Sequence, residues 1–238
     1  QYYYSKISVK AIHVPRKEAF REGLSSLRLG LYIVAGAMLS SVCMFGVKAY
    51  ISRTVDVHTA GLFQSAWTIT NIYLGLELRS MGTDFFPRLS AIVSDAGKVR
   101  KLINEQSYIV LVIAAPIVVA MLLFSDLAFQ IFYSSDFLPA SNLLRWQVAA
   151  TFRKVLSWPI DFIMLAKVKG KIYLFSEVVF FAAYLVFGFL LFPKCGLDGF
   201  GIGFFIAYLV YLPMIYIIGW KISRFSWSRD IAVMVTVN

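Results

Sequence analysis

Long apolar segments alternate with shorter polar ones along most of the chain. Six of the apolar segments are long enough to cross a hydrocarbon core of about 30 Å as a helix that rises 1.5 Å per residue. They are residues 29–51, 60–78, 107–124, 140–166, 172–192 and 199–220. The sequence lacks the runs of about ten alternating residues that transmembrane strands show. We therefore predict an all-α, polytopic membrane helix bundle with six transmembrane helices, the second of which extends to about residue 94.

The segments that flank this bundle are more polar. Residues 1–28 carry six Lys or Arg residues and are predicted to be a cytoplasmic connector. Within it, Arg16–Leu27 could form a basic amphipathic helix on the membrane surface, although a solvated linker fits the same pattern. Residues 221–238 are predicted to be a cytoplasmic segment followed by the start of a further helix. Because the chain begins with Gln1 and its last apolar run, Ile231–Asn238, is too short to span a membrane, we expect a piece of a longer protein.

The composition excludes several classes of protein. Hydrophobic residues make up 59% of the 238 residues and charged residues 15%, whereas soluble domains average about 45–50% and about 25%. A single soluble domain and a disordered chain are both excluded. The two cysteines and two histidines lack metal-ligand spacing, and no P-loop, HExxH motif or nucleophile elbow is present. We therefore predict no catalytic residue, no metal, no cofactor and no enzymatic activity.

The net charge of +10 is distributed unevenly over the connecting segments. Only Arg53 and Lys194 lie on one side of the predicted topology, whereas seventeen Lys and Arg residues lie in the segments on the other side: residues 1–28, 79–106, 167–171 and 221–230. Loops rich in Lys and Arg stay in the cytoplasm, so both ends are predicted to be cytoplasmic, and the positive charge requires no nucleic acid as a partner. In the outer connection, Leu127–Tyr133 is predicted to be a short interfacial helix.

The fourth apolar segment carries charges at a depth where insertion is costly, and such residues usually face a wet interior. Gln147, Lys154 and Asp161 repeat at intervals of seven, which places them on one helix face. Lys154 and Asp161 lie about 10 Å apart along the axis, so each needs water or a partner on another helix. An interhelical ion pair that fixes packing is one interpretation. The interpretation that we favour is a hydrated cationic path, lined by Arg145, Gln147, Arg153, Lys154 and Lys48.

Four carboxylates are candidates for coupling to a proton or an ion: Glu77, Asp84, Asp161 and Glu177. Glu77 and Asp84 could equally be surface residues at the membrane boundary. Asp161 and Glu177 flank the short connection 167–171, so they should lie at the same depth, where two carboxylates can hold a proton or a cation. The interpretation that we favour for this pair is an ion pair with one of the lysines in that connection, Lys167, Lys169 or Lys171.

Three glycines, Gly199, Gly201 and Gly203, open the sixth apolar segment. No strand precedes them, and their spacing differs from that of a dinucleotide-binding motif. Gly199 and Gly203 form a GxxxG pair, which predicts close packing of this segment against a neighbouring helix.

Six strings, taken in their order and spacing, resemble one family of membrane proteins. They are AGLFQSAWTITNIYL (Ala60–Leu74), MGTDFFPRLSAIVSD (Met81–Asp95), INEQ (Ile103–Gln106), FYSSDFLPASNLLRW (Phe132–Trp146), WPIDFIMLAK (Trp158–Lys167) and GLDGFGIGFFIAYLVY (Gly196–Tyr211). Over roughly residues 23–230 the chain resembles the bacterial O-antigen translocases. These are lipid-linked oligosaccharide flippases of the multidrug/oligosaccharidyl-lipid/polysaccharide exporter superfamily, built from two pseudo-symmetric halves.

The resemblance implies that this chain is the C-terminal half of such a transporter, with the N-terminal half of the same protein as its partner. It also implies alternating-access flipping of an undecaprenyl-diphosphate-linked oligosaccharide, an O-antigen or related repeat unit, across the bacterial inner membrane. Membrane lipids and a polysaccharide polymerase would be further partners. The cations Arg145, Arg153, Lys154 and Lys48 would meet the anionic diphosphate.

Other functions stay open at the level of sequence. A cation-coupled drug exporter of the same superfamily would favour an acidic, aromatic pocket, whereas the charge in the middle of the fourth segment is basic. A membrane enzyme of polysaccharide assembly would need large outer loops with polar catalytic residues, and the longest outer loop has about 15 residues. A chain whose role is assembly with its missing half is a further alternative.

Overall fold

The computed structural model describes residues 16–228 and Ile231, and the side chains of residues 16–19, 21–22 and 73–81 are not among those described. Within this part, the chain forms seven α-helices and one short 3-10 helix, η1, and no strand. The elements are α1 (Arg16–Thr54), α2 (Val57–Ala91), α3 (Ala96–Leu123), α4 (Ser125–Phe132), η1 (Ser135–Ala140), α5 (Ser141–Ala166), α6 (Gly170–Cys195) and α7 (Asp198–Ser223). The prediction of an all-α helix bundle is confirmed.

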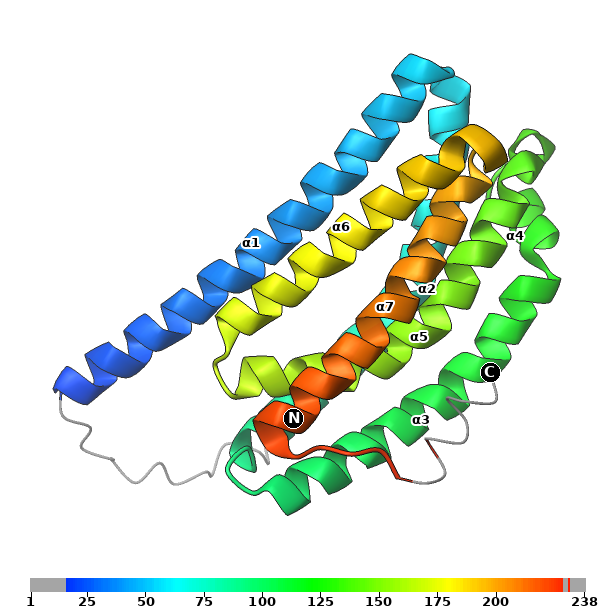
Figure 1. The fold of residues 1–238 in the computed structure, drawn as a ribbon. Helices are drawn as coiled ribbons and strands as arrows, with labels where there is room; N and C mark the ends of the chain where they lie inside the picture. Colours follow the sequence, from blue (N-terminus) through cyan, green and yellow to red (C-terminus); the bar gives the residue numbers. More distant parts are fainter. Residues whose placement is uncertain (1–15, 229–230, 232–238) are drawn as a thin grey trace, which may run out of the picture.

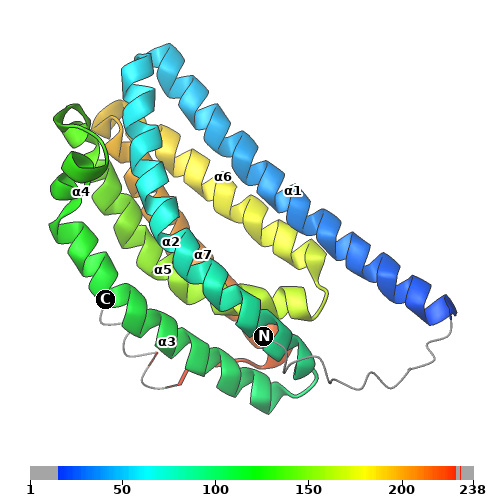
Figure 2. The same cartoon turned by 180° about the vertical axis from the view of Figure 1, so that it is seen from behind.

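The long helices form a row in which α1, α6, α7, α5 and α3 follow one another (Figure 1). α2 crosses the back of this row and packs against α1 and α5, as the reverse view shows (Figure 2). The turns that join α1 to α2 and α6 to α7 lie at one end of the bundle, together with α4 (Figure 1). The turns after α2 and α5 lie at the opposite end, which agrees with the alternation of connections that the sequence predicts.

Polar side chains in the connections fix where two of the helices begin. Asp56 accepts a hydrogen bond of 2.6 Å from the backbone N–H of Thr59 at the start of α2, and Asp95 accepts one of 3.1 Å from Lys98 at the start of α3. These N–H groups hold the pKa of both carboxyls below the usual value, because they stabilise the ionised form.

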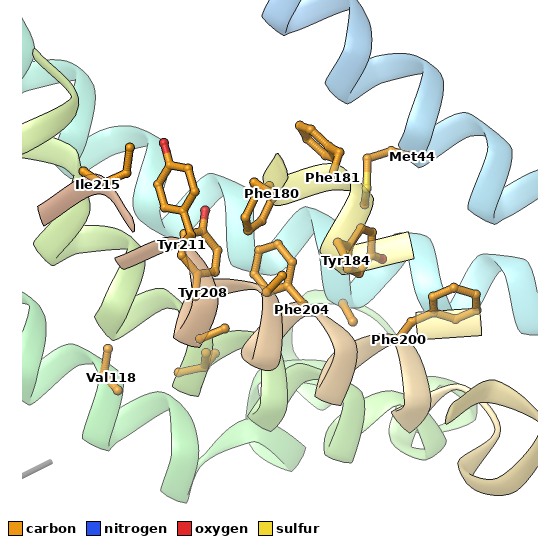
Figure 3. Close-up of a cluster of buried hydrophobic side chains, with 14 of the residues drawn as sticks. Met44, Val118, Phe180, Phe181, Tyr184, Phe200, Phe204, Tyr208, Tyr211 and Ile215 are labelled. Atoms are coloured by element: carbon orange, nitrogen blue, oxygen red, sulfur yellow. The ribbon is translucent and has the colours of Figure 1, made fainter. Parts of the chain in front are cut away.

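The centre of the core lies between α6 and α7 and is largely aromatic. Figure 3 shows Phe180 and Phe181 of α6 next to Phe204, Tyr208 and Tyr211 of α7. The ring centroids of Phe180 and Tyr208 are 4.6 Å apart, and those of Phe180 and Tyr211 are 5.5 Å apart. Such tilted and edge-to-face pairs add to the energy of burial alone.

Glycines allow α6 and α7 to approach each other closely. A Cβ atom on Gly203 would lie 2.6 Å from the backbone nitrogen of Gly188, and one on Gly199 would lie 2.6 Å from the backbone carbon of Leu191. Both distances are too short for any side chain, because backbone atoms of α6 occupy the space. The close packing that the GxxxG pair predicts is therefore confirmed.

In the part of the chain that the structure describes, four helical segments are long and apolar enough to cross a membrane: Gly23–Thr54, Ala96–Leu123, Gly170–Cys195 and Asp198–Ser223. They expose large apolar side chains, among them Leu31, Met38, Val112 and Leu190, which suits contact with lipid rather than water. α2 and α5 have 35 and 26 residues but are not among the four. In α5, the charges of Arg153, Lys154 and Asp161 lower the apolar content. Six spanning helices therefore remain a prediction.

The boundaries differ from those predicted at the start of α3, which begins at Ala96 instead of residue 107, and at the two ends. α1 runs from Arg16 to Thr54 without a break near residue 28, where the sequence predicts a change from connector to spanning helix. After α7, the chain crosses to α3, where the Asn104 side chain bonds the backbone of Ser226 and Ser228. The first residues of the connector and the predicted start of a further helix after Ile231 lie outside the described residues. α4 corresponds to the short helix predicted at Leu127–Tyr133.

Candidate functional site

A partly open cavity of about 300 Å³ lies inside the bundle, between α1, α2, α5, α6 and α7. Its charged lining residues are Lys154 and Asp161 of α5 and Glu177 of α6. Its other polar lining residues are Ser40, Asn71 and Ser157. Most of the remaining wall is aromatic and consists of Trp67, Trp158, Phe162, Tyr173, Phe180, Phe181, Phe204, Tyr208 and Tyr211.

The α5 wall of the cavity follows directly from helical spacing. Lys154, Trp158, Asp161 and Leu165 are separated by three or four residues, which places them above one another on the same helix face. The sequence predicts this face from the repeat of Lys154 and Asp161. A charged face on a helix of this depth is stable only where other polar groups or water meet it.

Tyr211 orients Asp161 from the opposite side of the cavity. Its hydroxyl donates a hydrogen bond of 3.0 Å to Asp161 Oδ1, so α7 and α5 are joined at this point. Lys154 interacts electrostatically with both Asp161 and Glu177. Among the described residues, however, no carboxylate lies within 4 Å of the Lys154 ammonium group to form an ion pair. The three charged side chains therefore line one cavity without an ion pair between Lys154 and either carboxylate.

Glu177 enters the cavity where α6 meets α1. A Cβ atom on Gly36 of α1 would lie 3.2 Å from the ring of Tyr173 and 3.5 Å from Cγ of Glu177. An alanine here would press on the Tyr173 ring and would make ordinary van der Waals contact with Glu177. The small residue in α1 thus sets the position of Glu177 and Tyr173 relative to the cavity.

The predicted ion pairs between Asp161 or Glu177 and the lysines of the α5–α6 turn need correction. Lys167 turns away and donates a hydrogen bond of 3.0 Å to the backbone oxygen of Ile222. Within the described part of the chain, no ion pair joins these carboxylates to Lys169 or Lys171 either. The physical reason is that α7 packs between α5 and α6, so both carboxylates point into the space that the three helices enclose.

Arg153 is adjacent to Lys154 in sequence but faces another part of the molecule. Its guanidinium lies 4.4 Å from the ring centroid of Phe205, in a cation–π contact. It lines a separate apolar groove of about 290 Å³ together with α3 residues such as Val118 and Leu122. Successive residues of a helix differ by about 100° in direction, and here this difference turns Arg153 toward α3 and Phe205 while Lys154 faces the cavity.

The remaining predicted path residues also lie away from the cavity. Arg145 forms an ion pair of 3.1 Å with Asp126 of α4. Lys48 donates a hydrogen bond of 2.9 Å to Gln64, and buried Gln147 accepts one of 3.0 Å from Thr70 of α2. Of the five predicted path residues, the structure places Lys154 alone in the wall of the cavity. Substrate binding by the other four stays a prediction.

The predicted coupling residues of α2 are likewise separate from the cavity or outside the description. Asp84 forms an exposed ion pair of 3.2 Å with Arg88, one turn further along α2, which agrees with the alternative of a surface residue. The side chain of Glu77 lies outside the described residues. Within the described part of the chain, no group of three or more His, Cys, Asp or Glu side chains could hold a metal ion.

Sequence reasoning missed the aromatic wall and Tyr211. Aromatic residues are frequent throughout the apolar segments, so their number does not point to a site. One signal was available: Phe204, Tyr208 and Tyr211 are spaced by four and three, which places two phenol groups on one face of α7. Two phenols on a buried helix face need hydrogen-bond partners, and Asp161 supplies one of them.

A bundle of membrane-length helices around a charged interior cavity defines a multi-pass helical membrane protein. Residues 7–142 match a family described as polysaccharide biosynthesis protein. Because the match covers more than half of the chain, the chain belongs to this family. The matched segment ends just inside α5, so Lys154, Asp161 and Glu177 lie beyond it.

Curated relatives are flippases. The chain is 25% identical over 154 residues to the Lipid III flippase of Escherichia coli (strain K12), and to the Lipid III flippase of Shigella flexneri at the same identity. The alignment covers 65% of this chain and 37% of each relative, so the chain spans little more than a third of the relatives' length. These proteins are transporters rather than enzymes, in agreement with the sequence-based prediction. No solved structure matches the chain.

Proposed function

We propose that this chain is part of a flippase for an undecaprenyl-diphosphate-linked oligosaccharide, an O-antigen or related repeat unit, in the bacterial inner membrane. The observation that carries the proposal is the cavity in which Lys154 faces Asp161 and Glu177 between membrane-length helices. Membership of a polysaccharide biosynthesis family and similarity to two Lipid III flippases support it.

The physical argument starts from the cost of moving a polar head group through hydrocarbon. A charged side chain at the bilayer centre costs about 2.5–3.5 kcal/mol on insertion scales, so an unassisted sugar diphosphate would face a much larger barrier. A polar cavity inside the bundle replaces part of the lost hydration. In the proposed mechanism, the N-terminal half of the same protein covers the open side of this cavity and rocks against it.

Transport by reconstituted protein tests the proposal. Lys154→Met removes the positive charge of the cavity but keeps a similar length. We expect flipping of a fluorescent lipid-linked oligosaccharide in proteoliposomes to fall at least about tenfold, since one charge-assisted hydrogen bond from Lys154 to the head group is worth that much. Lys194→Met is the matched control, because Lys194 is exposed at the end of α6. The control should flip the lipid at the normal rate.

Two results would contradict this assignment. The first is normal flipping by Lys154→Met in a well-inserted protein, which would remove the cavity from the transport path. The second is an equal loss in Lys194→Met, which would point to a general effect of charge on insertion. The amount of inserted protein in the vesicles, measured on the same samples, separates these cases.

One observation favours a second candidate, a cation-coupled exporter of organic cations. The cavity combines two carboxylates with an aromatic wall, the chemistry that attracts a large organic cation. Asp161 and Glu177 would serve as the coupling groups in either mechanism. Uptake of tetraphenylphosphonium into the same proteoliposomes, dependent on an imposed proton gradient and lost in Asp161→Asn, would support the exporter instead of the flippase.

A further inference from the structure

We infer that the cavity binds a sugar ring of the transported molecule rather than its diphosphate. This inference rests on the proposed function and concerns which part of the substrate the cavity recognises. It follows from four properties of the cavity wall: its charge, its aromatic groups, its balance of hydrogen-bond donors and acceptors, and its size.

The charge of the wall disfavours a diphosphate. Lys154 supplies one positive charge, whereas Asp161 and Glu177 supply two negative charges. Unless both carboxyls carry protons, the wall has no net positive charge to offset an anion. The other cations that could do so, such as Arg153 and Arg145, face the Phe205 ring and Asp126 instead.

The aromatic wall suits the apolar faces of a sugar. Trp67 of α2, Trp158 and Phe162 of α5, and Tyr173 of α6 line the cavity and are each only partly buried. The C–H bonds on one face of a pyranose ring are slightly positive and pack against the electron-rich face of an aromatic ring. Partly buried rings on three different helices can therefore contact a sugar from several sides.

The side chains that face the cavity offer hydrogen-bond acceptors, chiefly the carboxylates of Asp161 and Glu177, together with donors, chiefly the Lys154 ammonium group and two tryptophan N–H groups. Asp161 interacts with the hydroxyl groups of Tyr211 and Ser157, and a carboxylate has about four acceptor positions. Within the described part of the chain, Glu177 has no hydrogen-bond partner, and Asn71 donates to the Trp67 backbone oxygen, which leaves its own oxygen to accept. A ligand whose groups both donate and accept hydrogen bonds matches this wall. Sugar hydroxyl groups do both, whereas phosphate oxygens at neutral pH mainly accept.

The volume of the cavity matches a small part of an oligosaccharide. About 300 Å³ corresponds to about ten water molecules at their volume of ~30 Å³ each in the liquid. This space holds a sugar ring with its substituents, and further sugars would extend through the open side of the cavity. The charge then sets a preference, because a neutral sugar or an amino sugar is accepted whereas a uronic acid is repelled by Asp161 and Glu177.

Saturation-transfer NMR on the full chain in lipid nanodiscs tests the inference with defined probes. The probes are the methyl glycosides of N-acetylglucosamine, glucosamine and glucuronic acid, together with inorganic pyrophosphate as a competitor. We expect transfer to the first two glycosides, at least about tenfold weaker binding of the glucuronide, and no displacement of the bound glycosides by pyrophosphate.

Two variants distinguish a change in ligand preference from a loss of binding caused by misfolding. The double variant Asp161→Asn, Glu177→Gln should invert the preference, so that the glucuronide binds better than the glucosaminide, because Lys154 then has no opposing charge. A misfolded protein cannot gain such binding. The matched control is Asp84→Asn, since Asp84 is an exposed carboxylate outside the cavity, and it should keep the original preference.

The inference is overturned if pyrophosphate displaces the glycosides, if the glucuronide binds as well as the glucosaminide, or if no glycoside shows transfer. Failure of the proposed function looks different. If the glycosides bind as expected but lipid-linked oligosaccharide is not flipped, the sugar site stands and the flippase assignment falls. If flipping proceeds without glycoside binding, the reverse holds.

Discussion

At the scale of single residues, the turn between α5 and α6 contains a backbone conformation that its side chain disfavours. Val168 has φ of 55°, in the left-handed region that glycine usually occupies. The N–H of Val168 donates to Leu165 and that of Lys169 to Met164, which is the Schellman arrangement at a helix end. The hydrogen bonds of the turn thus hold a β-branched residue where a left-handed conformation costs about 1–2 kcal/mol.

Replacement of this valine tests the strain. Val168→Gly should raise the free energy of unfolding by up to about 1 kcal/mol, because relief of the strain exceeds the added entropy of glycine in the unfolded chain. Val168→Ala is the control, since alanine keeps the Cβ atom and should bring little gain. Thermal unfolding of the purified protein in detergent measures both, and a lower stability of the glycine variant would contradict the strain.

The cations of α5 show how far residue-level prediction from the sequence could go. Lys154 and Asp161 were placed on one face by their spacing of seven, and the structure puts both in the cavity wall. Arg153 could not be assigned in this way, because its site depends on Phe205 of α7. Arg145 likewise meets Asp126 on a separate short helix. Contacts between distant segments decide these roles, and one helix's periodicity contains no information about them.

At the scale of elements, the close approach of α6 and α7 is the most sensitive to substitution. Gly203→Ala would place a Cβ atom 2.6 Å from the backbone of Gly188, so the helices must separate. We expect a loss of about 1–3 kcal/mol in the free energy of unfolding, the usual cost of overpacking. Unfolding by denaturant in detergent micelles is a suitable measurement.

A glycine in open space provides the control for this prediction. No atom lies within 4 Å of a Cβ added to Gly46 of α1, so Gly46→Ala should be neutral or stabilising, as for other glycines in helix interiors. Equal destabilisation by both alanines would show that close packing is not the cause.

The apolar runs predicted the positions of the helices more accurately than the residues at which the helices begin and end. The sequence placed the helix bundle and the short helix α4, because long apolar stretches and amphipathic turns are local properties. It did not predict that α1 continues from Arg16 through residue 28, since a helix carries basic residues as readily as apolar ones once it has begun. The start of α3 at Ala96 depends on the Asp95 cap rather than on hydropathy.

At the scale of the whole molecule, the orientation in the membrane is testable with fusions. Seventeen Lys and Arg residues lie in segments on one side of the predicted topology and two on the other, which predicts that the α5–α6 turn is cytoplasmic. A reporter that is active only outside the cytoplasm should be silent when fused after Lys169 and active when fused after Asp136. The opposite pattern would reverse the topology.

The length of α1 has a mechanical consequence. Its 39 residues extend about 58 Å, whereas a hydrocarbon core is about 30 Å thick. α1 contributes Ser40 to the cavity wall and meets α6 at Gly36, while the end near Arg16 projects past the rest of the bundle (Figure 1). From Gly36 to Thr54, α1 is held by α6 and α2, with Met44, Val47 and Ile51 in the core, so the segment before Gly36 is the longer and less supported arm. A tilt of about 10° at Gly36 would displace the Arg16 end by about 5 Å, so a small movement beside the cavity would become a larger one at the predicted cytoplasmic surface.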